Sequence, residues 1–283
     1  MLRFSDISSA QDHLKKQRSH GKTIGLVPTM GALHDGHYSL IRASLKENDV
    51  TLTSIFVNRI QFNKSEDFEN YPVNLESDIS NLEKVGNDIV FTPSQDDMYP
   101  EEPVLSINFG RLAHDLEGEF RPGHFSGVGL VVSKLLNIVN PDRAYFGQKD
   151  LQQFAVISRL VKDLSYNVEL RCIPTLRTST GLALSSRNRR LSTKGLQQAS
   201  ILYKSLIYAK EQLQKKVDFL DITREIQNLC YESSVDLEYF EIVNPITLES
   251  ISEIEVYDEV ALCIAGYVEG VRLIDNMIVS YEY

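Results

Sequence analysis

The sequence has only three cysteines and no apolar run long enough to span a membrane. Cys172, Cys230 and Cys263 are isolated and odd in number, which fits neither a disulfide framework nor a CxxC metal site. The first twenty residues are polar, and Lys15-Lys16 is not followed by an apolar segment, so nothing in them directs export. We therefore expect a protein of the reducing cytoplasm.

Basic residues are also few relative to acidic ones. The chain has 29 Lys and Arg against 39 Asp and Glu, for a formal net charge of -10. Such a surface repels phosphate backbones, and no local basic patch offsets it, which argues against long nucleic acids as partners. With 42% hydrophobic and 24% charged residues, the composition is that of a soluble globular protein.

The first 175 residues alternate short β-branched segments with segments of helical period. This alternation is typical of a parallel sheet covered by helices on both faces. The predicted strands are 23–27, 50–57, 88–91, 143–146 and 167–173. The predicted helices are one ending near Gly86, one through 128–139 with Ser126 as its cap and Asn140-Pro141 as its stop, and one over 150–162.

The pattern changes after Pro174. A loop rich in Arg, Ser and Thr precedes two predicted helices and then three predicted strands. The first of these helices begins at about residue 193, and the second spans 221–230. The strands cover 237–243, 259–266 and 270–279, with a turn at 267–269. A chain of 283 residues suits two domains, so we predict an α/β domain over residues 1–175 and a smaller α+β domain over residues 176–283.

The strongest chemical signal is the decapeptide PTMGALHDGH at residues 28–37, which follows the first predicted strand and begins a helix. Ligands of parallel sheets bind beyond the carboxyl ends of the strands, where the N–H groups of a starting helix favour an anion. His34 and His37 are three residues apart, so both can donate hydrogen bonds to one triphosphate. Helix capping is the alternative role, and a zinc pair is less favoured because no HExxH frame or third ligand stands nearby.

A second polar site follows the next predicted strand. Gln61, within FVNRIQF, carries an amide that can bind the hydroxyl and carboxylate groups of a hydroxy acid, although alone it would suit an ordinary loop. Asp67 and Asp78 are candidates to assist magnesium, among many surface acids.

Two later segments offer groups for phosphate. In FGQKDLQQ, Lys149 follows a predicted strand and can track the charge of a leaving diphosphate, while Asp150 can cap a helix or hold a ribose. At the predicted domain junction, GLALSSRN supplies two hydroxyl groups and a guanidinium for nonbridging phosphate oxygens. Each segment alone would suit an ordinary loop, and together they indicate a nucleotide site.

The decapeptide resembles the HxGH signature of the nucleotidylyltransferase superfamily, and in its full length that of the pantoate–β-alanine ligase family. FGQKDLQQ and GLALSSRN are similar to that family's FGxKDxQQ and GLAxSSRN motifs, and segments 238–243 and 272–276 extend the resemblance over nearly the whole chain. The resemblance implies a Rossmann-like doubly wound parallel sheet with a C-terminal α+β lid domain. It also implies ATP-dependent condensation of pantoate with β-alanine through a pantoyl adenylate, with Mg²⁺, release of AMP and diphosphate, and a homodimer.

Motif by motif, the resemblance implies the following site. The predicted catalytic residues are His34, His37, Lys149 and Arg187. The predicted ATP contacts are Met30, Gly31, Ala32, Leu33, His34, Asp35, Gly36, His37, Gly147, Gln148, Lys149, Asp150, Leu176, Leu184, Ser185, Ser186 and Arg187. The predicted contacts to pantoate and β-alanine are Gln61, Gln153 and Met30, and the magnesium ligands are unassigned. The chain departs from the family pattern at Arg59, Val73 and Leu130, where Pro, Arg and Thr are usual.

Three other functions share parts of this pattern. A different nucleotidyl transfer, such as attachment of AMP to a phosphorylated alcohol, would use the same HxGH element and sheet. A nucleotide-sensing module would bind ATP without turnover, and a tRNA-charging enzyme carries a related signature. The FGQKD and SSRN segments favour the ligase over the first, and the acidic, short chain argues against the last.

Overall fold

The computed structural model describes residues 1–63, 68–69, 71–251 and 258–280. The chain divides into two compact units, each with its own hydrophobic core. The first unit comprises Met1–Gly147 and Gln152–Pro174, and the second comprises Gln148–Leu151 and Thr175–Tyr283. Four residues in the middle of the sequence therefore belong, by their contacts, to the C-terminal unit.

The first unit is built on a six-stranded parallel sheet in the order β1-β4-β3-β2-β5-β6. Its strands are β1 (Leu2–Phe4), β2 (Ile24–Thr29), β3 (Val50–Ile55), β4 (Ile89–Phe91), β5 (Arg143–Gly147) and β6 (Glu169–Ile173). Every residue of β3 is buried, as expected for a parallel sheet covered on both faces. The predicted Rossmann-like α/β fold is confirmed.

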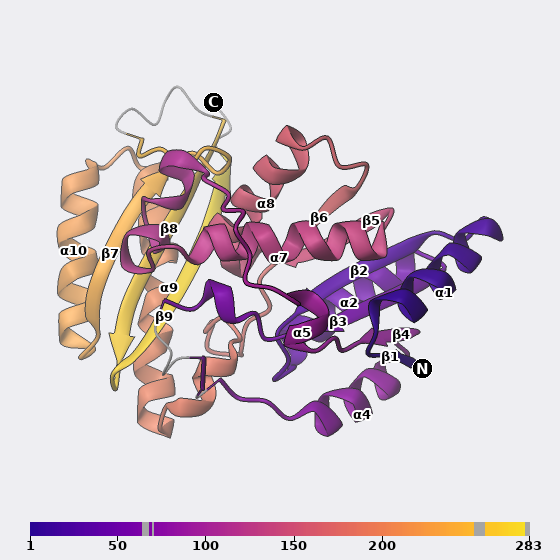
Figure 1. Ribbon diagram of the computed structural model, residues 1–283. Coiled ribbons are helices and arrows are strands. Elements are labelled where there is room, and N and C mark those ends of the chain that lie inside the picture. Colours follow the sequence, from indigo (N-terminus) through magenta and orange to yellow (C-terminus); the bar gives the residue numbers. More distant parts are fainter. Residues whose placement is uncertain (64–67, 70, 252–257, 281–283) are drawn as a thin grey trace. The chain divides into compact units, whose positions relative to one another are not determined.

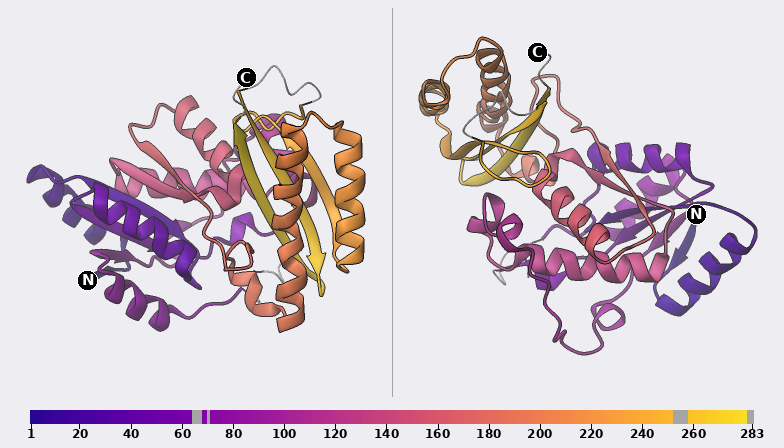
Figure 2. Two further views of the ribbon diagram at one scale, coloured as in Figure 1. Left: turned by 180° about the vertical axis from the view of Figure 1, so that it is seen from behind. Right: turned by 90° about the horizontal axis from the view of Figure 1, so that it is seen from above.

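Helices cover both faces of this sheet. They are α1 (Ile7–Ser19), α2 (Asp35–Glu47), α4 (Leu75–Val85), α5 (Gln95–Met98), α6 (Glu117–Phe120), α7 (His124–Val139) and α8 (Leu151–Asp163), with the 3₁₀ turns η1 (Arg59–Gln61) and η2 (Gly110–Ala113). Apolar side chains of α1, α7 and α8 share one core cluster with the sheet, and those of α2 and α4 share another. Accordingly, α7 lies in front of the sheet in Figure 1 and α2 in the reversed view of Figure 2.

Helix α7 begins earlier than predicted. Gly123, in the left-handed conformation at φ 78°, precedes the helix, so Ser126 is not its cap, and the prediction was wrong on this point. The Ser126 hydroxyl instead accepts a hydrogen bond from the backbone N–H of Ile107 at 3.2 Å. The predicted stop is confirmed, because Asn140 ends the helix in the left-handed conformation, as Gly86 does for α4.

The second unit has an antiparallel sheet in the order β7-β8-β9. Its elements are η3 (Gln148–Asp150), η4 (Ser186–Arg190), α9 (Thr193–Gln214), α10 (Phe219–Glu232), β7 (Asp236–Val243), β8 (Glu259–Val268) and β9 (Val271–Ser280). Helices α9 and α10 pack on one face of this sheet (Figure 1). Glu269 and Gly270, both at positive φ, join β8 to β9 in a two-residue turn that suits the twist of a hairpin.

None of the helices in the described part of the chain is long and apolar enough to cross a membrane.

Candidate active site

The loop between β2 and α2 is held in shape by a buried carboxylate. Asp78, on α4, is only 4% exposed, and its two oxygens accept hydrogen bonds from the backbone N–H groups of Ala32 and Leu33, each at 2.8 Å. Gly31 is at φ +86°, and a Cβ atom there would lie 3.1 Å from Asp78 Oδ2. Both oxygens of Asp78 thus accept hydrogen bonds from the loop, which gives this residue a structural role, and its assistance to magnesium stays a prediction; Asp67 lies outside the described residues.

Replacing Asp78 by asparagine should lower the free energy of unfolding by about 1–3 kcal/mol, because an NH₂ group would then face a backbone N–H in a buried site. Denaturant unfolding followed by circular dichroism measures this loss. Glu76→Gln is the matched control, since Glu76 is exposed in the same first turn of α4. Equal stabilities of the two variants would contradict the assigned role of Asp78.

His34 and His37 form a reciprocal cap at the start of α2. His34 is the N-cap residue, and its Nδ1 accepts from the backbone N–H of Gly36 at 3.1 Å. Nδ1 of His37 accepts from the backbone N–H of His34 at 3.3 Å, and the two ring centroids are 4.2 Å apart. Because each Nδ1 accepts, the neutral rings carry their protons on Nε2. Capping and donation to a phosphate are therefore compatible, each using a different ring nitrogen.

Gln61 and Met30, two predicted substrate contacts from different loops, lie together in the structure. The Gln61 side chain is buried, and its Nε2 donates to Met30 Sδ at 3.0 Å. Its Oε1 accepts from Nδ2 of the buried Asn58 at 3.2 Å. Because Met30 belongs to the β2–α2 loop, this hydrogen bond places Gln61 beside that loop, while the role of both residues as substrate contacts stays a prediction.

Helix α7 contacts the segment 58–61 and holds it in place. Nδ2 of Asn58 also donates to the backbone carbonyl of Gly127 at 3.1 Å, and His124 Nδ1 lies 2.9 Å from the Gln61 carbonyl oxygen. A Cβ atom on Gly127 would lie 2.7 Å from Gln61 Cα, so only glycine permits this approach. Asn58 lies in the segment FVNRIQF, but no spacing rule indicated that Asn58 and His124 would both hold Gln61.

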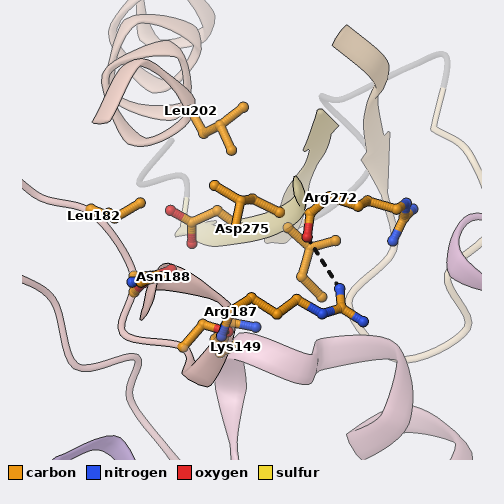
Figure 3. Close-up of a pocket in the computed structure, with 11 residues that line it drawn as sticks. Lys149, Leu182, Arg187, Asn188, Leu202, Arg272 and Asp275 are labelled. Atoms are coloured by element: carbon orange, nitrogen blue, oxygen red, sulfur yellow. Dashed lines mark hydrogen bonds between the residues drawn. The ribbon is translucent and has the colours of Figure 1, made fainter. Parts of the chain in front are cut away.

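The phosphate-binding candidates Lys149, Ser185 and Arg187 line one pocket in the second unit (Figure 3). Arg187 Nη1 donates to the carbonyl oxygen of Arg272 on β9 at 3.2 Å. Lys149 Nζ lies 3.5 Å from Asp150 Oδ1. Residues 38 positions apart in sequence are thus brought to one place by the C-terminal unit.

An ion pair between the buried Asp275 and the partly buried Arg177 lies against this pocket. Arg177 Nη1 and Nη2 donate to Asp275 Oδ2 and Oδ1 at 2.5 and 2.9 Å, and the guanidinium carbon lies 4.2 Å from the centre of the Tyr203 ring. Burial raises the pKa of the Asp275 carboxyl, and Arg177 beside it acts in the opposite direction. The fork geometry of the pair fixes the middle of strand β9, which carries Asp275.

The predicted site residues fall into two groups, one in each unit. The first unit holds the β2–α2 loop, Gln61, Gly147 and Gln153, and the second holds Gln148, Lys149, Asp150, Leu176, Leu184, Ser185, Ser186 and Arg187. Leu184 N–H donates to the Leu176 carbonyl at 2.9 Å, so these two residues pair across the loop that precedes the SSRN segment. Of the departures from the family pattern, Arg59 and Val73 are exposed, and Leu130 is buried in α7.

Within the residues that the structure describes, no three His, Cys, Asp or Glu side chains gather in a way that would hold a metal ion.

Comparison with known proteins gives a consistent result. A family model described as pantoate-beta-alanine ligase matches residues 3–278. The chain is 46% identical to a pantothenate synthetase of Cytophaga hutchinsonii over 281 residues, covering 99% of each. It is similar in structure to the pantothenate synthetase of Thermus thermophilus, with TM-score 0.91, 37% identity and coverage of 98% and 99%. It also resembles a pantoate-beta-alanine ligase of Francisella tularensis complexed with beta-gamma ATP and beta-alanine, with TM-score 0.80, 36% identity and coverage of 98% and 97%.

Proposed function

This chain belongs to the pantoate–β-alanine ligase family, and on that premise we propose that it joins pantoate to β-alanine in two steps. The pantoate carboxylate attacks the α-phosphorus of ATP, which forms pantoyl adenylate and releases diphosphate. The β-alanine amine then attacks the acyl carbon, and AMP leaves. The observation that carries the proposal is the His34–His37 cap beyond the carboxyl end of β2. The same loop carries Met30, whose Sδ accepts a hydrogen bond from Gln61.

The first step needs no general base, because the pantoate carboxylate is ionised at neutral pH. The obstacle is the approach of an anion to a polyanion. Nε2–H of His34 and His37 and the start of α2 supply donors in the first unit, and Lys149, Ser185, Ser186 and Arg187 supply donors in the second. Mg²⁺ bound to ATP neutralises further charge, while Gln61 and Gln153 orient pantoate.

The second step needs an uncharged amine, and no residue is assigned to remove its proton. The mixed anhydride must be kept from water, so we assign the C-terminal unit the role of a lid. Full activity of a chain that ends at residue 175 would contradict this role.

Omission of single substrates tests the reaction. With ATP, Mg²⁺, pantoate and β-alanine present, AMP should form in step with pantothenate, and omission of any one should stop the product. Without β-alanine, labelled diphosphate should exchange into ATP only when pantoate is present. Diphosphate exchange at the same rate with and without pantoate would favour another nucleotidyl transfer. Tight ATP binding without turnover would favour a nucleotide-sensing module.

We also propose that the protein is a homodimer of the cytoplasm. Adjacent apolar side chains at Val104 and Leu105 are 100% and 67% exposed, and we assign them to the surface that the partner subunit covers. Analytical ultracentrifugation of the parent should show a dimer, and a Val104→Asp, Leu105→Lys variant should shift toward monomer. A parent that sediments as a monomer would refute the dimer.

A further inference from the structure

The turn η3, which carries Lys149, is fastened to strand β9 by one buried side chain. Asn276 is 4% exposed, and its Nδ2 donates to the carbonyl oxygens of Gln148 and Lys149, each at 2.9 Å. Gln148 Nε2 lies 3.5 Å from Asn276 Oδ1 on the opposite side of the amide. Both N–H bonds of the Asn276 amide are therefore used to hold the backbone of this turn.

Asn276 is itself fixed by the neighbouring ion pair. Arg177 Nη2 donates to the Asn276 carbonyl at 3.2 Å as well as to Asp275. Asp275 Oδ1 accepts from the Asn276 N–H at 2.8 Å, and Arg177 Nη1 also donates to the Gly181 carbonyl at 3.0 Å. The backbone of Asn276, in the middle of β9, is thus held by Arg177 and Asp275.

The same stretch of β9 also positions Arg187. The Arg272 carbonyl accepts from Arg187 Nη1, as the dashed line in Figure 3 shows. The Arg272 guanidinium is itself held by Glu238, with Nε 2.7 Å from Oε2. Arg272 and Asn276 therefore serve as two anchors on one strand, Arg272 for Arg187 and Asn276 for the turn that carries Lys149.

We propose that Asn276 is a positioning residue for Lys149, which it holds in the same pocket as Arg187 and Ser185. This inference rests on the proposed function for the identity of the ligand, the phosphates of ATP. A lysine on an untethered turn would sample many positions, and misplacement of a charge-stabilising group by about 1 Å can cost about 100-fold in rate. The tether to β9 explains why residues 148–151 belong to the C-terminal unit although the chain returns to the first unit directly afterwards.

Substitution of Asn276 by aspartate tests the inference. A carboxylate oxygen would then replace the NH₂ group, and it would repel the carbonyl oxygens of Gln148 and Lys149 where Asn276 donates hydrogen bonds to them. Asn276→Asp should slow pantoate-dependent diphosphate exchange up to about 100-fold, with the KM for pantoate unchanged. Asn228→Asp on the exposed face of α10 is the matched control for the added charge and should behave as the parent. Asn276→Ala, which buries no charge, serves if the aspartate variant does not fold.

A double-mutant cycle identifies the partner. If Asn276 acts through Lys149, the Asn276 substitution should have little further effect on the rate in a Lys149→Ala background. Rate losses that multiply in the double variant would overturn the inference, as would a folded Asn276→Ala variant as active as the parent.

Hydrogen exchange gives a readout that does not depend on the reaction. Backbone amides of residues 148–152 should exchange faster in Asn276→Asp or Asn276→Ala, while those of α10 exchange as in the parent. Exchange at parental rates in residues 148–152 would refute the tether. A parent without pantoate-dependent diphosphate exchange would refute the proposed function instead, so the two failures are distinguishable.

Discussion

Replacement of either His34 or His37 by alanine should slow adenylate formation about 10²–10³-fold, the usual effect of removing one preorganised donor from a charged transition state. The expectation rests on the protonation of Nε2, which follows because each Nδ1 accepts a backbone N–H. Single-turnover formation of AMP-linked pantoate measures the step directly. A His37→Ala, Lys149→Ala double variant that makes product as fast as the parent would show that these donors do not serve the reaction.

The two roles of His34 can be separated by a second variant. His34→Ala removes the helix cap as well as the donor and should cost about 1 kcal/mol of stability. Asparagine is a good N-cap residue, so His34→Asn should keep the stability of the parent while its short side chain does not replace the Nε2 donor. If His34→Asn is fully active, then His34 is needed only for the cap.

Asp275→Ala should lower the free energy of unfolding by about 3–5 kcal/mol, because it leaves the charge of Arg177 without its partner. The side chains of Asp275 and Arg177 are 3% and 18% exposed, and this partial access to water places the expected loss toward the lower end of that range. Denaturant unfolding followed by circular dichroism measures it.

The paired replacement Arg177→Met, Asp275→Leu is the control for that experiment. Apolar residues of similar size leave no buried charge, so the double variant should be more stable than Asp275→Ala. A loss below about 1 kcal/mol in Asp275→Ala would mean that the pair behaves as a surface salt bridge and does not fix the middle of β9.

The local sequence pattern predicted the central strands of the parallel sheet well and its edge at β1 poorly. Val50 begins a strand in prediction and structure alike, and only the end moves from Val57 to Ile55. Strand β1 and helix α1 were missed, because β1 has three residues and α1 buries only Ala10 and Leu14, which leaves a weak apolar pattern.

The supports of the site could not be read from the sequence, since they join distant residues. Asp78 reaches the backbone of Ala32 across 46 positions, and Asn276 reaches that of Lys149 across 127. No periodicity links such pairs, whereas the motif residues themselves follow strand ends that are visible in the pattern. The roles of individual site residues stay predictions until the variants above are measured.

The placement of residues 148–151 has a consequence for a chain cleaved once between Pro174 and Thr175. The N-terminal fragment would include residues 148–151, which belong by their contacts to the fold of the other fragment. There, Asn276 donates hydrogen bonds to two of their carbonyl groups. The nicked protein should therefore persist as a noncovalent complex.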